Sequence, residues 1–595
     1  MDAPASIEAI LASLQPRETA SHDFRPRAFR AWVAELPLAN VAETGRLVHA
    51  ALREMNRTRL PAPERLELLR SLEQPVADVL AAVRRHFVGR PLPLPERGRK
   101  AARVAMELAG QMALGYELAA REAARGGRTS LKSGAIHGAL EHLGRVLLTA
   151  YQVYRPPPEG LWRGLHRLYG FAETHDLAGV PVAAGTPAGD DLTPTPAAAY
   201  KRALLLALAC PYRMRQGEVQ AVYRALAAWS GQARLEPLGD PIRQEGLFVV
   251  HLDSDEPPRY RSLDRVACTP ATCRVLDTAP LGEHLRRALS GAREGDGGTL
   301  ATDGRPTAAL LRRLVLNWGV MPRRGFARAE HHAEAELLVG LSAIHQHLRR
   351  EAAPPEAATP GAAWHGPEPV PGIEAVISGR ARFEGAPSPG EIPDVWDLAY
   401  DAAPPTGSPR MVVPETEPAP SPPPELEYPV HRCQVENMSP GGYRIRCAPG
   451  DDGTFQLQVG ELVGVRERGE SRWQIAAVRW AKCLGPGRVE MGIQVIASCA
   501  EPGFARRDPQ APWAPVLLVP EVRSVQQPAG ILAPPFVLRQ ASVVELRSAD
   551  GTCPVRLTRT VENTGCFAHF HYARADRGEN PQPGEDDIDA LWSAL

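Results

Sequence analysis

Residues 431–447 read HRCQVENMSPGGYRIRC and give the clearest indication of the fold. Apolar and polar residues alternate on both sides of the centre of this stretch, and the centre carries Ser-Pro-Gly-Gly, a combination typical of turns. The stretch therefore predicts two β-strands joined by a turn. Further strand-like runs follow, namely FQLQV, GELVGVRE, RWQIAAVRWAKC and RVEMGIQVIAS. Together these runs predict a small antiparallel barrel.

The turn carries the residues that point to ligand binding. Asn437, Ser439 and Gly442 fit the pattern [D/N]xSxxG. A glycine permits positive φ and lets a flat base approach the backbone, and Asn and Ser offer the mixed donors and acceptors that a purine edge or a ribose needs. Gly441 is an additional candidate for the same reason. We expect these residues on the surface of the barrel.

A pair of arginines precedes the barrel. Residues 321–330 read MPRRGFARAE, in which Arg324 and Arg328 are spaced RxxxR, and Arg323 could replace Arg324 if the register slips by one. The apolar run AELLVGLSAIH that follows can serve as a barrel strand. Paired guanidinium groups bind phosphate oxygens or the guanine O6 and N7 atoms bidentately. This loop therefore favours a ligand with two phosphates.

The two motifs, together with a closing strand of the GIQVI type, resemble the PilZ family. The resemblance covers about residues 320–348 and 430–500. It implies a six-stranded barrel that binds cyclic di-GMP, without a further cofactor. The resemblance implies that Arg324 and Arg328 wrap the ligand and that the turn contacts a guanine through Asn437, Ser439 and Gly442. Arg323 and Gly441 are additional candidates for ligand contact.

One feature departs from typical members, because a Pro-rich insertion at 349–427 separates the two motifs. Loop-closure cost rises only logarithmically with length, so the two halves can still pair. The insertion predicts disorder, since it buries too little apolar area to offset chain entropy. Within it, the apolar island around Trp396 either docks on a partner or on its own domain, or is loosely packed.

The sequence predicts a multidomain α+β protein in which an N-terminal all-α helical bundle precedes a small antiparallel six-stranded PilZ-like barrel and a second small C-terminal β lobe. Apolar residues recur at helical spacing in the first part, as in Ile136, Leu140 and Leu143. The expected units are a helical module at 1–230 (two sub-bundles or one long bundle), a mixed connecting lobe at 231–318, the barrel at 319–348 and 428–503, the insertion at 349–427, the β lobe at 510–573 and an acidic tail at 574–595.

Composition narrows the class of protein. Lys plus Arg number 68 and Asp plus Glu number 69, so no global basic field favours nucleic acid. The longest apolar helical stretch, Ala203–Cys210, is far below the roughly 18 residues of a membrane span. The first residues lack the pattern of an export signal, which predicts a cytoplasmic protein. RNA binding needs aromatic side chains over a basic face. Aromatic residues make up only 6% of the chain and form no such stripe, which argues against RNA binding.

The sequence predicts neither catalysis nor a metal site. It contains no GxxxxGK[ST], HExxH or GxSxG motif. The nine cysteines lack zinc spacing and are interpreted as reduced thiols. The histidines in and around the AELLVGLSAIH run complete no recognised ligand pattern; they are His331, His332, His345 and His347.

Two functions remain open. The first is a cyclic di-GMP receptor that couples nucleotide binding at the barrel to the arrangement of a helical partner-binding module. The alternative is a ligand-independent scaffold with a degenerate barrel, which would recruit protein partners through the helical region and the Trp396 island.

Overall fold

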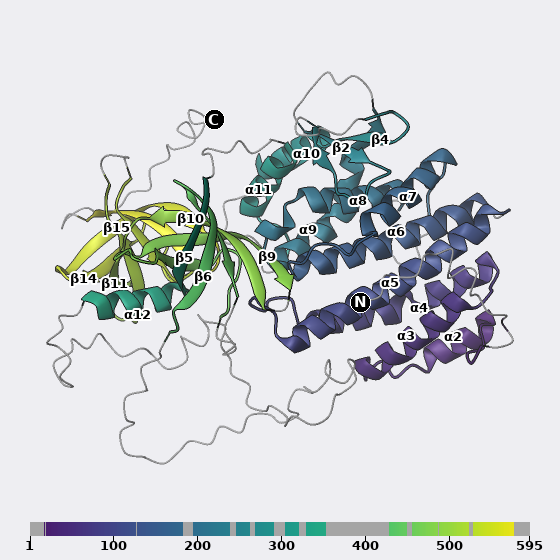
Figure 1. Cartoon of the computed structure of the whole chain (residues 1–595), viewed down its shortest axis with the longest axis horizontal. Helices are drawn as coiled ribbons and strands as arrows, with labels where there is room; N and C mark the ends of the chain where they lie inside the picture. The colour runs from purple at the N-terminus through teal and green to yellow at the C-terminus, as the bar shows by residue number, and fades with distance from the viewer. Residues whose placement is uncertain are drawn as a thin grey trace, which may run out of the picture.

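The computed structural model of the 595-residue chain describes residues 17, 20–126, 128–182, 194–238, 246–261, 268–290, 304–319, 329–352, 428–448, 455–485, 487–522 and 527–575. These residues form a helical module, a small mixed lobe and two closed β-barrels (Figure 1). None of the described helices combines the length and the apolarity that a bilayer span requires.

Neighbouring antiparallel helices of the helical module pack closely against one another. A Cβ on Gly138 would lie 2.5 Å from the Tyr116 ring, so the glycine lets α6 pack directly on α5. Side-chain caps fix two of the helix starts, since Asn40 and Thr195 each accept a backbone N–H three residues ahead. The elements are α2 (Pro26–Ala34), α3 (Val41–Arg57), α4 (Ala62–Arg84), α5 (Glu96–Ala124), α6 (Thr129–Gln152), α7 (Leu161–Thr174), α8 (Pro196–Leu208) and α9 (Gln216–Trp229), with short 3₁₀ turns at Pro211–Arg213 and Ser230–Gln232.

The mixed lobe is a four-stranded sheet of order β1-β4-β2-β3 with two helices. Its second helix is fixed to the helical module, because Trp318 Nε1 donates to the Leu205 carbonyl (3.1 Å) and Asn317 Nδ2 donates to the Ala209 carbonyl (2.9 Å). The elements are β1 (Arg234–Pro237), β2 (Leu247–His251), β3 (Arg259–Tyr260), β4 (Cys273–Asp277), α10 (Ala279–Ser290) and α11 (Ala308–Gly319).

The middle barrel closes in the order β10-β7-β6-β5-β8-β9. Its two halves, which the 349–427 segment separates in sequence, pair directly through β5 and β6. Alternate residues such as Val435, Ile445 and Met491 fill the interior. The elements are β5 (Ala329–Val339), α12 (Leu341–Ala352), β6 (His431–Ser439), β7 (Gly442–Cys447), β8 (Leu462–Glu467), β9 (Gln474–Gly485) and β10 (Arg488–Ala497).

One run that was predicted as a single strand forms a strand in its first half and a helix in its second half. The run AELLVGLSAIH was expected to be extended throughout, but β5 ends at Val339 and α12 begins at Leu341. Gly340 lies between them at φ +92°, and its N–H donates to the Leu462 carbonyl (2.8 Å) as the last bond of the ladder. Helix α12 then packs between the two barrels, where Ile344 joins an apolar cluster that includes Leu517 and Phe567.

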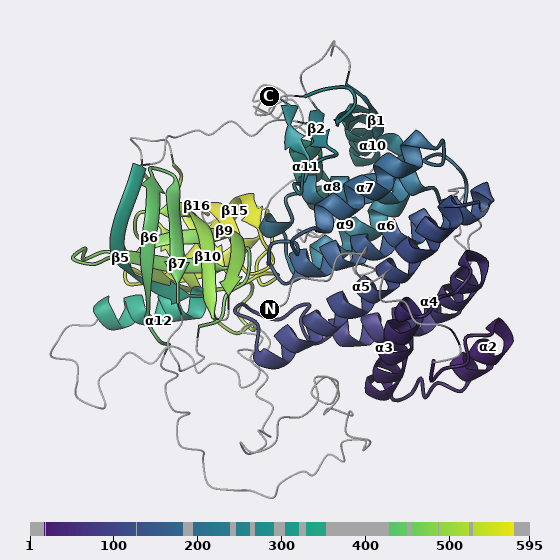
Figure 2. The same ribbon diagram turned by 45° about the vertical axis from the view of Figure 1, so that its right-hand side comes forward.

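The C-terminal β lobe proves to be a second closed barrel, of order β11-β12-β13-β16-β15-β14. Figure 2 shows both barrels beside the helical module, with α12 along one end of the pair. The elements are β11 (Glu501–Arg506), β12 (Ala514–Val519), β13 (Gly530–Ala533), β14 (Val543–Ser548), β15 (Gly551–Asn563) and β16 (Ala568–Arg574).

Candidate functional site

The predicted binding turn is a tight hairpin connection between β6 and β7. Ser439 and Gly442 form the last ladder pair before the turn, and Ser439 Oγ donates to the Gly442 carbonyl (3.3 Å). On its other side the turn is tied to β10, because the Val495 N–H donates to the Gly441 carbonyl (3.1 Å). The structure therefore brings Asn437, Ser439, Gly441 and Gly442 together at one end of the barrel wall.

Gly442 permits a close approach of two strands. Its φ is +151°, and a Cβ built on it would lie 2.0 Å from the Ile493 carbonyl oxygen and 3.0 Å from the Gln494 Cα. Both neighbours are backbone atoms of β10, which cannot move aside without breaking the ladder. The glycine of the motif thus lets the turn lie directly against β10, and the ligand contact that the resemblance implied stays a prediction.

Asn437 belongs to a row of residues that crosses five strands of the outer wall. In the ladder it is opposite both Glu330 and Arg444, and Arg444 is in turn opposite Gly492, which is opposite Trp480. The strands that carry this row lie side by side in the order β5, β6, β7, β10 and β9 (Figure 2). A Cβ on Gly492 would lie 1.9 Å from Trp480 Nε1, so the indole ring covers this glycine. The row presents an amide, a guanidinium group and an aromatic ring side by side.

The charges on this wall balance one another. Glu490, which is only 5% exposed, accepts from Arg444 Nε (2.8 Å) and lies 4.0 Å from Arg446 Nη2. Arg446 Nη1 also lies 2.9 Å from Glu436 Oε1. Two arginines therefore face two carboxylates, and this part of the wall has no surplus positive charge to offer an anion. The alternation of GYRIRC would have placed Arg444 and Arg446 outside, but their partners are distant in sequence.

The predicted arginines Arg323, Arg324 and Arg328 lie outside the described residues, as does Trp396. The structure does describe the start of β5, the strand that follows these arginines in the sequence. β5 begins at Ala329, and Ala329 is opposite Met438 in the ladder. The first residue of β5 is thus paired within the motif, between Asn437 and Ser439.

The histidines noted in the sequence do not converge. His331 Nε2 contacts Glu467 (2.9 Å), His345 Nε2 contacts the Gly503 carbonyl (2.9 Å), and His347 contacts Glu351 (3.3 Å). Burial lowers the pKa of His345 to about 4, so this imidazole is neutral at physiological pH.

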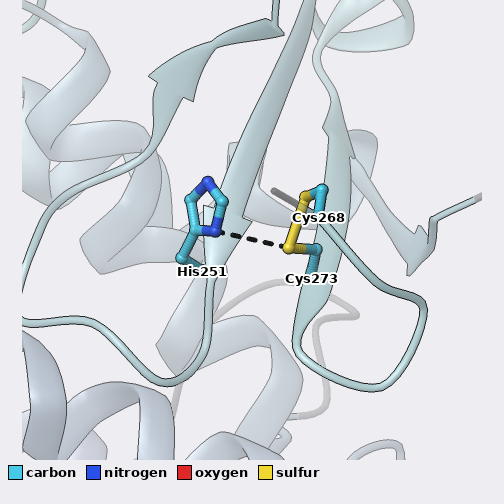
Figure 3. Close-up of side chains that lie close together, drawn as sticks. All are labelled: His251, Cys268 and Cys273. Atoms are coloured by element: carbon cyan, nitrogen blue, oxygen red, sulfur yellow. Dashed lines mark hydrogen bonds between the residues drawn. A yellow bond between two sulfur atoms is a disulfide. The ribbon is translucent and has the colours of Figure 1, made fainter. Parts of the chain in front are cut away.

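The cysteines differ from the prediction. The structure bonds Cys268 to Cys273 and Cys433 to Cys447, so the interpretation of all nine as reduced thiols was wrong for four of them. His251 lies beside the first pair, and these three form the one group of potential metal ligands within the described ranges (Figure 3).

A cavity of about 320 Å³ lies elsewhere, where the helical module meets both barrels. Leu92 and Leu457 exchange two backbone hydrogen bonds at its wall (2.7 and 2.8 Å). Nearby, Arg215 Nη2 donates to Cys566 Sγ (2.8 Å), and burial raises the pKa of Glu461 to about 7. This junction joins the helical module to the two barrels, and none of the predicted binding residues that the structure describes lines it.

Comparisons with known proteins agree with this layout. Three family models match: the N-terminal domain of "Cyclic-di-GMP receptor FimW" at residues 27–240, the middle PilZ domain of the same receptor at 247–502, and the "FimW C-terminal beta-barrel domain" at 505–575. A curated protein of Pseudomonas aeruginosa, named "Cyclic-di-GMP receptor FimW", is 30% identical over 615 residues, which cover 96% of each chain. The chain belongs to the FimW family. No solved structure matches it significantly.

Membership of the FimW family confirms the PilZ resemblance and the fold class: a helical region followed by two antiparallel six-stranded barrels. The FimW middle-domain match begins at residue 247, the first residue of β2, so it includes three strands of the small sheet as well as the barrel.

Proposed function

We propose that this chain is a cyclic di-GMP receptor, not an enzyme, and that its ligand binds the wall of the middle barrel around the β6–β7 turn. The observation that carries the proposal is the β5–β6 register, in which Ala329 is opposite Met438. The segment that ends at Arg328 therefore joins the barrel beside Asn437 and Ser439. The name of the Pseudomonas relative, which aligns over nearly the whole chain, supports the same ligand.

The charge balance of the wall supports a role for the preceding arginines. Because Arg444 and Arg446 already face Glu436 and Glu490, phosphates on this wall need further cations. Residues 320–328 contain three arginines within six positions, namely Arg323, Arg324 and Arg328. In the proposed complex these arginines bind the phosphates, while Asn437 and Ser439 bind a guanine edge and Gly442 holds their turn, with Gly441 beside it.

Isothermal titration calorimetry tests the proposal. Cyclic di-GMP should release measurable heat with the wild-type protein, and GTP should not. Asn437→Ala should weaken binding about tenfold, because one or two hydrogen bonds are worth about 1–2 kcal/mol. Arg488→Ala is the matched control, since Arg488 is exposed at the other end of β10. A wild-type protein that binds no nucleotide would favour the ligand-independent scaffold instead.

We further propose that binding changes how the helical module sits against the barrel. The arginine segment connects Gly319, the end of α11, to Ala329, the start of β5. α11 is fixed to α8 through Trp318, so the segment links two different bodies. Ordering a loop with phosphates is an established way to bias a two-state arrangement. The protein partner would then contact the helical module or the Trp396 region, in the cytoplasm.

Hydrogen–deuterium exchange measures this coupling. Cyclic di-GMP should slow exchange both at the start of β5 and in the last turn of α11, and it should leave α3, at the far end of the module, unchanged (Figure 1). Protection confined to the barrel would contradict the coupling while leaving the binding site intact.

A further inference from the structure

His251, Cys268 and Cys273 converge at one end of β2 and β4, the two central strands of the small sheet (Figure 3). His251 is the last residue of β2 and Cys273 the first of β4, and the two are opposite each other in the antiparallel ladder. His251 Nδ1 lies 3.3 Å from Cys273 Sγ. One ligand atom from each of the three residues lies within 4.8 Å of the others. Imidazole nitrogen and thiolate sulfur are the ligands that zinc prefers.

The backbone around the cysteines is held by bonds other than the one between the sulfurs. The Thr269 carbonyl accepts the N–H groups of Thr272 (3.1 Å) and Cys273 (2.8 Å), which closes a turn between the two cysteines. Arg274 Nη1 donates to the carbonyls of Pro270 and Cys273, each at 2.7 Å. The turn therefore keeps both sulfur positions close together when the disulfide is reduced.

The two sulfurs are bonded in the structure, so a metal site requires reduction first. A cellular dithiol supplies the two electrons: it forms its own disulfide, and Cys268 and Cys273 each gain one hydrogen as thiols. Binding of a divalent cation then releases two protons as the thiols become thiolates. In a tetrahedral zinc site the ligand atoms lie about 3.5–3.8 Å apart, given bond lengths of about 2.0–2.3 Å. Side-chain rotation alone can bring the sulfurs to that separation.

We propose that reduced Cys268 and Cys273, together with His251, form a binding site for one thiophilic divalent cation of the zinc class, with a fourth position for water or an external ligand. The same sulfur atoms are either metal ligands or a disulfide, so the site responds to the redox state. This inference does not depend on nucleotide binding at the barrel.

The site lies where the small sheet meets the helical module. The chain that leaves His251 reaches Asp255, whose carboxylate accepts the N–H groups of Gly160 (2.6 Å) and Arg163 (2.9 Å) at the start of α7. A cation that ties β2 to β4 should hold this contact in place. We therefore expect the metal to raise the melting temperature of the reduced protein, since it binds the folded state, where all three ligands converge, more tightly than the unfolded chain.

Cobalt(II) titration of the full-length protein tests the site. After reduction with a phosphine under anaerobic conditions, one equivalent of Co²⁺ should produce thiolate-to-cobalt charge-transfer absorption and the visible bands of tetrahedral cobalt, and Zn²⁺ should abolish both. Cys268→Ser should lose the charge-transfer absorption of one thiolate. His251→Ala should weaken affinity by at least the roughly 10- to 100-fold that the loss of an outer-shell partner costs.

The second cysteine pair provides the matched control. Cys433 and Cys447 face each other inside the middle barrel, so a Cys433→Ala, Cys447→Ala double variant should retain the full cobalt spectrum. Absence of a thiolate–cobalt spectrum in the reduced wild-type protein would overturn the proposal. An undiminished spectrum in both Cys268→Ser and Cys273→Ser would also overturn it, because the metal would then lie elsewhere.

Discussion

The Arg328→Ala variant is expected to lose at least about 100-fold in affinity for cyclic di-GMP, an effect that calorimetry would record as the near-disappearance of binding heat. A guanidinium group that binds phosphate bidentately makes two charge-assisted hydrogen bonds, each worth about 1.5–3 kcal/mol. Every 1.4 kcal/mol corresponds to a tenfold change in affinity, so the loss of both bonds costs about two or more orders of magnitude. Arg444 and Arg446 are already paired with Glu490 and Glu436, so neither can readily replace the lost contact.

The control for this variant must remove a similar charge without touching the turn. Arg488→Ala does so, because Arg488 is opposite Gly485 in the ladder, at the end of β10 remote from Gln494 and Gly442. It should bind as the wild type does. If the Arg328→Ala and Arg488→Ala variants released equal heats on binding cyclic di-GMP, the proposed phosphate contact would be excluded. If both variants bound as tightly as the wild type, the ligand would have to bind at a different site on the protein.

The β6–β7 hairpin contains one feature that local sequence patterns predict and one that they do not. Alternation and turn residues are local, so they predicted β6, β7 and the turn between them. The cysteine pair across the same hairpin could not be predicted. The ladder shifts register between Val435 and Asn437, and this bulge moves Cys433 from opposite Ala448 to opposite Cys447. Nothing in the alternation pattern marks a bulge.

Other features depend on contacts between distant residues. Closure of the C-terminal barrel needs β11 to pair with β14, and periodicity carries no information about such partners. The apolar run around Gly340 fits a buried strand or a buried helix equally well, which is why the start of α12 was missed. The ion pair of Arg444 with Glu490 joins residues 46 positions apart, so the charge balance of the wall became visible only in the fold.

Gly442→Ala is expected to destabilise the middle barrel by about 3 kcal/mol and to abolish nucleotide binding as the turn moves. The added methyl group would meet the Ile493 carbonyl oxygen at 2.0 Å, inside any tolerable contact distance. Relief requires β7 and β10 to separate, and forced overpacking of this kind typically costs about 1–3 kcal/mol before the strain of positive φ is added. Differential scanning calorimetry would record the change as a lower midpoint for the transition that includes the barrel.

Gly469→Ala separates the steric part of this effect from the conformational part. Gly469 belongs to the same barrel and has φ +99°, but nothing lies within 4 Å of a Cβ built there. Its replacement should therefore cost only about 1 kcal/mol of backbone strain and leave nucleotide binding unchanged. If the two variants were equally stable, contact with β10 would not be the reason for glycine at position 442. A destabilised Gly442→Ala alone would show that the last residue of the motif acts by letting two strands meet.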